Sequence, residues 1–398
     1  MGVQRIVDGD THVLEPVDIW DTWLPRRFWD KAPKLVKDVD GGDAWQFAGA
    51  TDPDPIGLVA TPGKPYDEFR WTGVSYDDAR PGCYDGAERL KDMDADGVDA
   101  AVLFAPQRTI GHFLGDEDDD FVRSGVDAYN RFLVEQFCAP DPNRLVALAQ
   151  MPSTGTDDCV EALRKAHAGG FRGVVISCWP SGRDSVSDAD DPFWAAASAE
   201  GMPVCIHINL ISRRARQAQR RAGAERLAAS AKKGSAGAHA GRSSKANAKA
   251  VAGLGGVFSV VPSTIGQLIF TGVFERFPSL QVNMIETGVG WIPHFLEQLD
   301  DRYWRNRSWG EIPIVEPPSF YWRRNMAATF ITDRTGIALR YAVGVENMMW
   351  SSDYPHHGND WPYSRKVIEE MMGHIPAGER NKIIGGNASR IYGLEQGA

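Results

Sequence analysis

The 398-residue sequence is poor in cysteine: it has five, an odd number that cannot pair completely. Two of them, Cys178 and Cys205, lie within apolar runs of strand length, which predicts buried, reduced thiols. Reduced thiols are typical of proteins in a reducing compartment, so we expect a cytoplasmic location. The cysteine content therefore argues against a small secreted scaffold held together by disulfides.

Long hydrophobic runs and excess positive charge are also missing. No stretch of about 18 apolar residues occurs, so no membrane-spanning helix is expected. Residues 1–7 do not combine a basic region with an apolar stretch, so no signal peptide is expected either. The formal net charge of -10 argues against general nucleic-acid binding. A small-molecule substrate is the partner that these absences leave.

What the sequence does contain is a regular alternation of apolar runs and helix-like stretches. Each run has the length of a strand and ends near polar or turn-forming residues. The runs are 4–9, 99–105, 144–151, 172–178, 203–209, 280–286, 326–332 and 346–352. Eight parallel strands joined by crossover helices predict a (β/α)8 barrel, and one such domain accommodates residues 1–398. An open doubly wound sheet is the alternative, but no Gly-x-Gly-x-x-Gly follows an early strand.

Two segments interrupt this alternation. The first, 14–85, follows the first strand and is rich in Trp, Pro, Asp and Gly, so we expect a cap over the barrel mouth. Its aromatic side chains either shape a substrate pocket or only hold the cap together. Both interpretations stay open.

The second interruption, 212–252, is strongly basic. It has eleven Lys and Arg against the single acid Glu225, and few large apolar side chains. Part of it is therefore expected to be mobile, although Ser212 to Leu227 could form a helix. It either recruits an anionic group, such as the phosphates of a coenzyme A thioester, or docks on the acidic body or a neighbouring subunit.

Asp and His residues end three of the predicted strands. Asp10 and His12 are two apart on the first strand, so their side chains point the same way. His207 ends the fifth strand and Asp353 ends the last. Because the first and last strands of a closed barrel are neighbours, these four side chains can meet at the mouth. The set predicts a divalent-metal site.

Four segments resemble the signatures of one enzyme family. They are Val7-Asp8-Gly9-Asp10-Thr11-His12-Val13-Leu14-Glu15-Pro16, Ile285-Glu286-Thr287-Gly288-Val289-Gly290-Trp291-Ile292-Pro293, Ser351-Ser352-Asp353-Tyr354-Pro355-His356 and Gly386-Asn387-Ala388-Ser389-Arg390-Ile391-Tyr392. The family is amidohydrolase family 2, which includes decarboxylases of the aminocarboxymuconate-semialdehyde and γ-resorcylate types. The resemblance implies a distorted TIM barrel, one zinc or manganese ion, and often a homodimer. It places Asp10, His12, His207 and Asp353 on the ligand positions.

One position departs from the family pattern. The decarboxylases have a catalytic His-x-Gly after the sixth strand, where this chain has Glu286-Thr287-Gly288. A carboxylate at 286 could act as a general base, bind the metal, or only hydrogen-bond to a ligand.

Two reaction types follow from this ligand set. The first is metal-assisted hydrolysis or non-oxidative decarboxylation of a carboxylate- or acyl-bearing substrate, with Glu286, His356 and Asp353 as catalytic groups. The second is oxidative: the carboxylate-rich set could hold iron, possibly two ions, and act on a bulky substrate linked to coenzyme A. Further residues near the predicted mouth are expected to bind substrate: Arg108, His112, His294 and His357.

Overall fold

The computed structural model describes residues 5–50, 52–232 and 257–394, and its centre is a barrel of parallel strands. In barrel order the strands are β1 (Val7–His12), β5 (Ala100–Phe104), β6 (Leu145–Ala147) continued by β7 (Ala149–Gln150), β8 (Val174–Ile176), β9 (Val204–His207), β10 (Val282–Ile285), β11 (Met326–Phe330) and β12 (Met348–Trp350). Seven of the predicted runs contain barrel strands and the run 4–9 overlaps β1, so the predicted order is confirmed. Backbone hydrogen bonds close the barrel beside β12, from Asp353 N to Asp10 O (3.1 Å) and from His12 N to Tyr354 O (2.7 Å).

Strand β1 is irregular at its centre. Its pairing with β5 shifts register between Asp8 and Thr11, and both of these side chains line one small cavity. Residues three apart lie on the same side of a strand only where an extra residue is inserted, which is the geometry of a β-bulge. The bulge lets Asp10 and His12 share the opposite side of the strand, where they approach each other.

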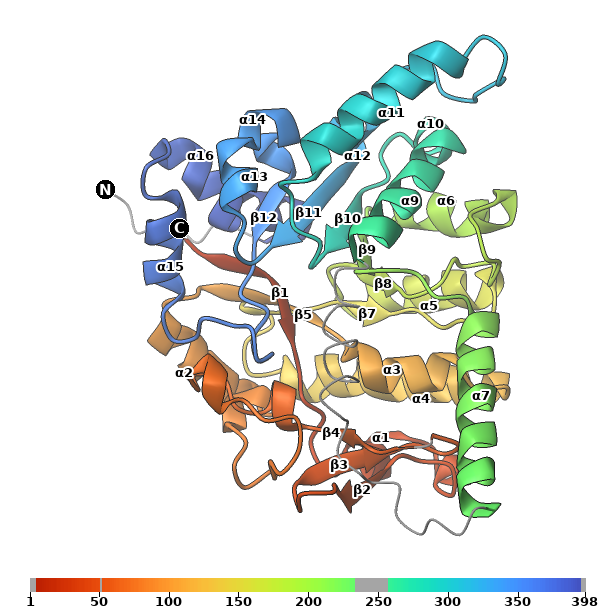
Figure 1. Cartoon of the computed structure of the whole chain (residues 1–398), viewed down its shortest axis with the longest axis vertical. Coiled ribbons are helices and arrows are strands. Elements are labelled where there is room, and N and C mark those ends of the chain that lie inside the picture. The colour runs from red at the N-terminus through yellow and green to blue at the C-terminus, as the bar shows by residue number, and fades with distance from the viewer. Residues whose placement is uncertain (1–4, 51, 233–256, 395–398) are drawn as a thin grey trace.

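Helices cover the outside of the barrel between successive strands (Figure 1). The sequence pattern predicted helices at 87–96, 118–138, 156–168, 190–200, about 255–277, 290–305, 334–343 and 363–373. Helices are present at these places: α2 (Gly86–Asp96), α4 (Asp119–Phe132), α5 (Thr156–Ala168), α6 (Asp191–Ala199), α9 (Val257–Phe270), α10 (Val273–Arg276), α11 (Ile292–Asn306), α13 (Arg334–Ala338), α14 (Arg340–Val343) and α15 (Ser364–Met372). Helix α2 shows why such segments form: the Asp85 carboxylate caps its N-terminus by accepting from Glu88 N, and Gly97 ends it in the left-handed region. Outside the two insertions, the described residues form four further helices that were not predicted: α3 (Gln107–Leu114), α12 (Pro318–Asn325), α16 (Ala377–Asn381) and α17 (Asn387–Ile391).

The first insertion forms a small layer of its own at one end of the molecule (Figure 1). It holds α1 (Ile19–Trp23) and an antiparallel sheet of β2 (Lys34–Lys37), β3 (Asp43–Gln46) and β4 (Asp54–Pro55). The buried Trp45 indole donates to Tyr76 Oη (3.1 Å), and that hydroxyl donates to Glu15 O (2.5 Å). This chain of hydrogen bonds anchors the insertion to the segment that follows β1.

The second insertion begins with helix α7 (Arg213–Lys232), which follows β9 and runs beside α3 towards the first insertion (Figure 1). The helix predicted from Ser212 to Leu227 is therefore present and extends further. The Arg220 guanidinium donates to Ala48 O (2.8 Å) and His112 O (3.0 Å), which ties the two insertions together. The rest of the stretch expected to be mobile, 233–252, lies outside the described residues.

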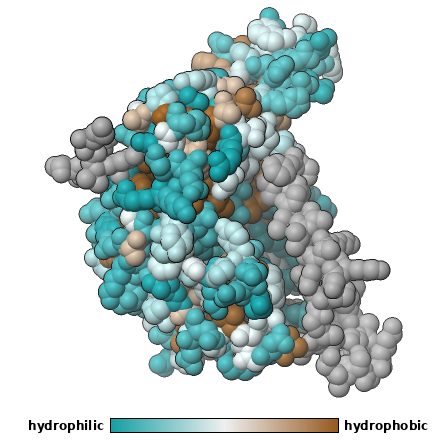
Figure 2. Space-filling model, turned by 60° about the vertical axis from the view of Figure 1, so that its left-hand side comes forward, coloured by the Kyte–Doolittle hydropathy of each residue, from teal (hydrophilic) through white to brown (hydrophobic). Residues whose placement is uncertain are grey.

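The core agrees with the predicted thiol chemistry, since all five cysteines are buried and unpaired. Among the described residues, no helix has both the length and the apolar character needed to cross a membrane. On the face shown in Figure 2, apolar side chains are scattered among hydrophilic ones.

Candidate metal centre

Four side chains from three strand ends meet inside the barrel mouth. Asp10 and His12 come from β1, His207 is the last residue of β9, and Asp353 follows β12. Each is at most 5% exposed. These are the four residues that the sequence marked as metal ligands.

The spacing of the four donor groups suits one ion. His12 Nε2 lies 3.5 Å from Asp10 Oδ1, 3.4 Å from Asp353 Oδ1 and 3.1 Å from His207 Nε2. His207 Nε2 lies 3.5 Å from Asp10 Oδ1. Ligand atoms held tetrahedrally at bonds of about 2.1 Å are roughly 3.4 Å apart. These four distances are close to the edges of such a tetrahedron, and His12 belongs both to the group with Asp10 and His207 and to a group with Asp353.

The hydrogen bonding of these carboxylates also fits a cation. Both oxygens of Asp10 and Oδ1 of Asp353 are buried without a hydrogen-bond partner among the described residues. Leaving charged oxygens buried and unsatisfied costs several kcal/mol in general. A metal ion would compensate that cost, so the residues present fit the ion that the sequence implies.

Backbone strain is concentrated at the same place. Ile208, Glu286 and Asp353 have φ values of 61°, 58° and 61°. The left-handed region is unfavourable for residues other than glycine, by about 1 kcal/mol or more, and such strain tends to persist at functional sites. Each of these residues directly follows a strand or lies within three residues of its end. The turns that they make leave the ends of β9, β10 and β12 facing the same centre.

Glu286 and His356 form the solvent-facing side of the cluster. Their side chains keep 27% and 31% of their surface exposed, in contrast to the buried ligands. Glu286 Oε2 lies 3.7 Å from His207 Nε2, and His356 Nδ1 lies 3.5 Å from Asp353 Oδ2. The backbone N–H of Glu286 donates to Thr329 Oγ1 (2.7 Å), which fixes the strained turn. A molecule entering from solvent would meet these two groups first.

The crowding of acids shifts their pKa values. Burial, then the charge of Asp353, raises the pKa of Glu286, and burial raises the pKa of Asp353 as well. Burial would also raise the pKa of Asp10, but the charge of the neighbouring His207 lowers it by more, so the pKa of Asp10 falls below the usual range. Without a cation this cluster holds protons on some of its carboxyls, and a divalent ion would displace them.

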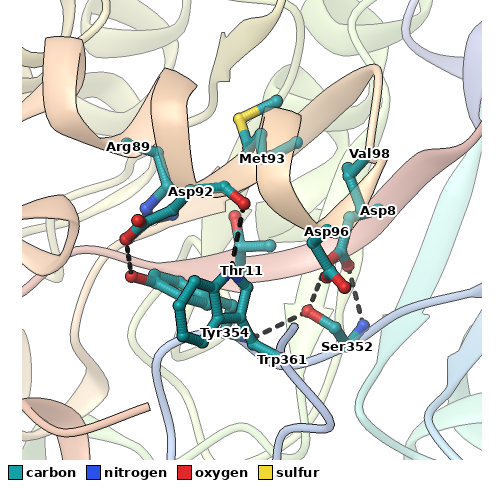
Figure 3. A pocket seen from close by; sticks show the side chains of 11 residues that line it. Asp8, Thr11, Arg89, Asp92, Met93, Asp96, Val98, Ser352, Tyr354 and Trp361 are labelled. Carbon is teal, nitrogen blue, oxygen red and sulfur yellow. Dashed lines mark hydrogen bonds between the residues drawn. The ribbon is translucent and has the colours of Figure 1, made fainter. Parts of the chain in front are cut away.

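A second set of polar residues supports the ligands from behind β1 (Figure 3). Asp8 accepts from Ser352 N (2.9 Å), Tyr354 Oη donates to Asp92 Oδ2 (2.6 Å), and Arg89 Nη2 donates to His12 O (2.7 Å). These bonds fix the backbone on either side of Asp353 and at His12. The cavity between them measures about 20 Å³, room for about one water molecule, so it supports the centre and cannot take an organic substrate.

The residues predicted to bind substrate are not all gathered at the centre. Arg108 is exposed and stacks on Trp71 of the first insertion at 4.1 Å. His112 stacks on Phe47 at 4.0 Å and lies 3.0 Å from an Asp54 oxygen. The other two are exposed: His294 on the first turn of α11, and His357 against Phe69. Arg108 and His112 thus join α3 to the first insertion, whereas His357 is near enough to Asp353 for its charge to act on that carboxyl.

Two residues near the centre were not singled out from the sequence. Asp8 precedes Asp10 by two positions, and residues two apart on a regular strand point to the same side, so the sequence could have suggested a place for Asp8 beside Asp10. The bulge instead turns Asp8 to the other side of the strand. Arg216 belongs to the basic insertion, where nothing in the composition distinguishes it from the neighbouring arginines. Its packing against Gly111 and Ser177 O becomes visible only in three dimensions.

Comparison with solved structures identifies the fold. An amidohydrolase from Mycobacterium avium subsp. paratuberculosis matches with a TM-score of 0.69 at 19% identity, over 98% of this chain and 99% of that one. 5-Carboxyvanillate decarboxylase from Sphingomonas paucimobilis matches with a TM-score of 0.63 at 22% identity, over 99% of this chain and 100% of that one. A dihydroxybenzoic acid decarboxylase from Polaromonas sp. JS666 was solved with manganese and the inhibitor 2-nitroresorcinol. It matches with a TM-score of 0.63 at 17% identity, over 99% of this chain and 98% of that one.

Comparison by sequence is decisive at the level of the family. A search of curated proteins finds no match to this chain. The amidohydrolase family model, by contrast, matches residues 7–394, which include both ends of the barrel and all four donors of the candidate centre. The chain therefore belongs to this amidohydrolase family, as its sequence signatures indicated.

Proposed function

We propose that this amidohydrolase-family enzyme acts on a carboxylate- or acyl-bearing organic substrate, with non-oxidative decarboxylation as the first reaction to test and hydrolysis as the second. The observation that carries the proposal is the division of the site into two parts. Four buried donors suit one ion, and the partly exposed Glu286 and His356 lie on its open side. The names of the similar structures, two of which are aromatic-acid decarboxylases, support the choice of reaction.

Asp10, His12, His207 and Asp353 would hold the ion, and zinc or manganese suits their mixed carboxylate and imidazole set. When bound, the ion would supply electrostatic stabilisation of negative charge on the substrate oxygens. Without the ion, burial raises the pKa of Glu286 to about 8, and its partly exposed carboxyl is placed to exchange a proton with a bound substrate. Glu286 thus takes the general-acid role and His356 lies within reach of Asp353 to relay a proton.

The proton balance of decarboxylation is simple. The bond between the substrate carbon and its carboxylate breaks, carbon dioxide leaves, and the carbon accepts a proton from Glu286 Oε2. Solvent then returns a proton to Glu286, whose side chain is 27% exposed. In hydrolysis the same carboxylate would instead accept a proton from water, which requires Glu286 to start ionised.

An anaerobic assay tests this proposal. Protein loaded with manganese or zinc would be incubated with 5-carboxyvanillate, 2,6-dihydroxybenzoate and simple aryl esters and amides, and carbon dioxide and product acids would be measured. Turnover without oxygen that disappears in Asp353→Ala supports the proposal. A protein that carries one ion and acts on none of these classes would contradict the reaction as stated.

A second candidate function is oxidative. Six donor side chains form three overlapping groups: Asp10 with His12 and His207, His12 with Asp353 and His356, and Asp10 with Glu286 and Asp353. That number of donors also suits two iron ions, which could activate dioxygen on a bulky substrate such as a coenzyme A thioester. Two irons per chain and turnover that requires oxygen would favour this candidate over the first.

A further inference from the structure

One arginine of helix α7, Arg216, lacks a carboxylate partner among the described residues. In the part of α7 whose side chains are described, residues 213–222, there are five arginines, and four of them form ion pairs: Arg213 with Asp119, Arg214 with Asp184, Arg220 with Asp116, and Arg221 with Glu117. Arg216 forms none with any acidic side chain in the part of the chain that the structure describes. Four arginines of α7 thus bind acidic side chains of the rest of the molecule. Arg216 is left without a carboxylate to bind among the described residues.

The Arg216 side chain points into the molecule. Its Nε is buried and has no hydrogen-bond partner among the described residues. Its Nη2 donates to Ser177 O at 3.3 Å. Its Nη1 lies against Gly111 of α3, where an added Cβ would be only 2.8 Å away. The guanidinium therefore lies between α7, α3 and the end of β8. It fits there because Gly111 has no side chain.

This position is close to the metal centre. Ile176 of β8 pairs with Ile206 of β9, so Ser177 lies beside His207 at the carboxyl ends of neighbouring strands. Neighbouring strands are about 4.8 Å apart. The carbonyl that holds Arg216 is therefore one strand away from a proposed metal ligand, on the same end of the barrel.

The electrostatics of Arg216 favour an anionic ligand. Burial lowers the pKa of this guanidinium, which shows that its charge is poorly compensated. A partly buried cation with only one carbonyl acceptor is unfavourable, and a carboxylate would satisfy it with charge-assisted hydrogen bonds. The planar fork of arginine matches a carboxylate in particular.

We propose that Arg216 binds a carboxylate of the substrate other than the group that reacts at the metal centre. The expected substrate is therefore a dicarboxylate, of which one carboxylate reacts at the metal centre and the other binds Arg216. An acid with a scissile acyl group at the metal centre and a separate carboxylate bound to Arg216 would fit in the same way. The inference rests on the proposed function, because it takes the metal centre as the place where the other end of the substrate reacts. It assigns a specificity-determining role to an insertion outside the barrel.

Binding measurements on the full, manganese-loaded chain test this role without requiring turnover. Isothermal titration with benzoate, isophthalate and terephthalate would compare one carboxylate with two. We expect at least one dicarboxylate to bind wild type about ten-fold or more tightly than benzoate does. Arg216→Met should remove that advantage and leave benzoate affinity unchanged. Arg214→Met, on the exposed side of the same helix, is the matched control and should keep the advantage.

The outcomes separate the two proposals. Equal affinity of wild type for all three acids, or an advantage that survives in Arg216→Met, would overturn the anchor role. If Arg216→Met fails to fold or to retain manganese, Arg216→Lys replaces it, because it keeps the charge but loses the fork: a reduced advantage supports the role and an unchanged one overturns it. Absence of turnover on every substrate class would remove the proposed function while leaving an Arg216-dependent difference in binding intact.

Discussion

Asp8 and Ser352 are 344 positions apart, and the Asp8 carboxyl accepts hydrogen bonds from both the backbone N–H and the hydroxyl of Ser352. This contact joins the first strand of the barrel to the turn that carries Asp353. It lies on the outer side of β1, away from the donors of the candidate centre, so its role can be tested separately from theirs.

Replacing Asp8 with Ala should lower the free energy of unfolding by about 2–3 kcal/mol, because it leaves two buried donors of Ser352 unsatisfied. Asp8→Asn keeps an acceptor for the backbone N–H and should cost less than about 1 kcal/mol. Urea denaturation of both variants measures the difference. Equal losses in the two variants would show that the hydrogen bonds to Ser352 are not what stabilises the closure.

Removing a buried donor of the metal centre should abolish metal retention. We expect less than about one tenth of the wild-type metal content per chain in His207→Ala and in Asp353→Ala, since each removes one of four ligands. Elemental analysis of protein purified without added metal measures this directly. His374→Ala, at an exposed histidine, should keep the wild-type content. Full occupancy in either ligand variant would rule out the centre as described.

Glu286 can be distinguished as a proton carrier or as a metal ligand by one substitution. Glu286→Gln keeps the size of the side chain but cannot exchange a proton, so we expect kcat to fall about 100-fold or more with metal content unchanged. Metal content and steady-state rates would be measured on the same preparation. A loss of bound metal that parallels the loss of rate would instead assign Glu286 to the ligand set.

Glu15 gives the protein a pH-dependent stability. Burial raises the pKa of its carboxyl to about 7, above the usual 4.5. A raised pKa means that the folded state holds the proton more tightly, so the stabilisation is complete below pH 4.5 and is lost as the pH rises to about 7. The loss amounts to about 3 kcal/mol at 1.36 kcal/mol per unit. Compared with wild type, Glu15→Gln should remove this part of the pH dependence between pH 5 and 8.

Denaturation curves at several pH values, with metal in excess, measure the Glu15 effect. Glu297→Gln, at an exposed position on α11, is the control and should follow the wild-type curve. A Glu15→Gln variant with the full wild-type pH slope would place the titrating group elsewhere.

The sequence predicted the barrel well because its strands are buried on both faces and therefore read as continuous apolar runs. It also marked Asp10, His12, His207 and Asp353, since polar residues at the ends of such runs are conspicuous. The bulge in β1 was not predictable, because it depends on the register between β1 and β5 and not on a residue type. Short helices such as α3 and α12 were missed for a related reason, as each is held by packing against its neighbours and not by a strong pattern of its own.

The substrate side of the site was the hardest part to predict. Arg108 and His112 were reasonable candidates by residue type, but their partners Trp71 and Asp54 come from the first insertion, whose path the sequence did not define. Arg216 differs from its neighbours only in having no carboxylate partner among the described residues, a property that no pattern within the sequence can reveal. Residue type thus predicted the candidate ligands, and only packing separated the arginines with carboxylate partners from the one without.

The closure between β1 and the turn after β12 also sets the order in which the site can form during synthesis. Asp10 and His12 leave the ribosome with the first strand, but Asp353 and His356 emerge only after almost nine tenths of the chain has been made. No earlier folding intermediate can present the complete donor set. A metal ion that needs all four donors would therefore bind late in folding, after the barrel has closed.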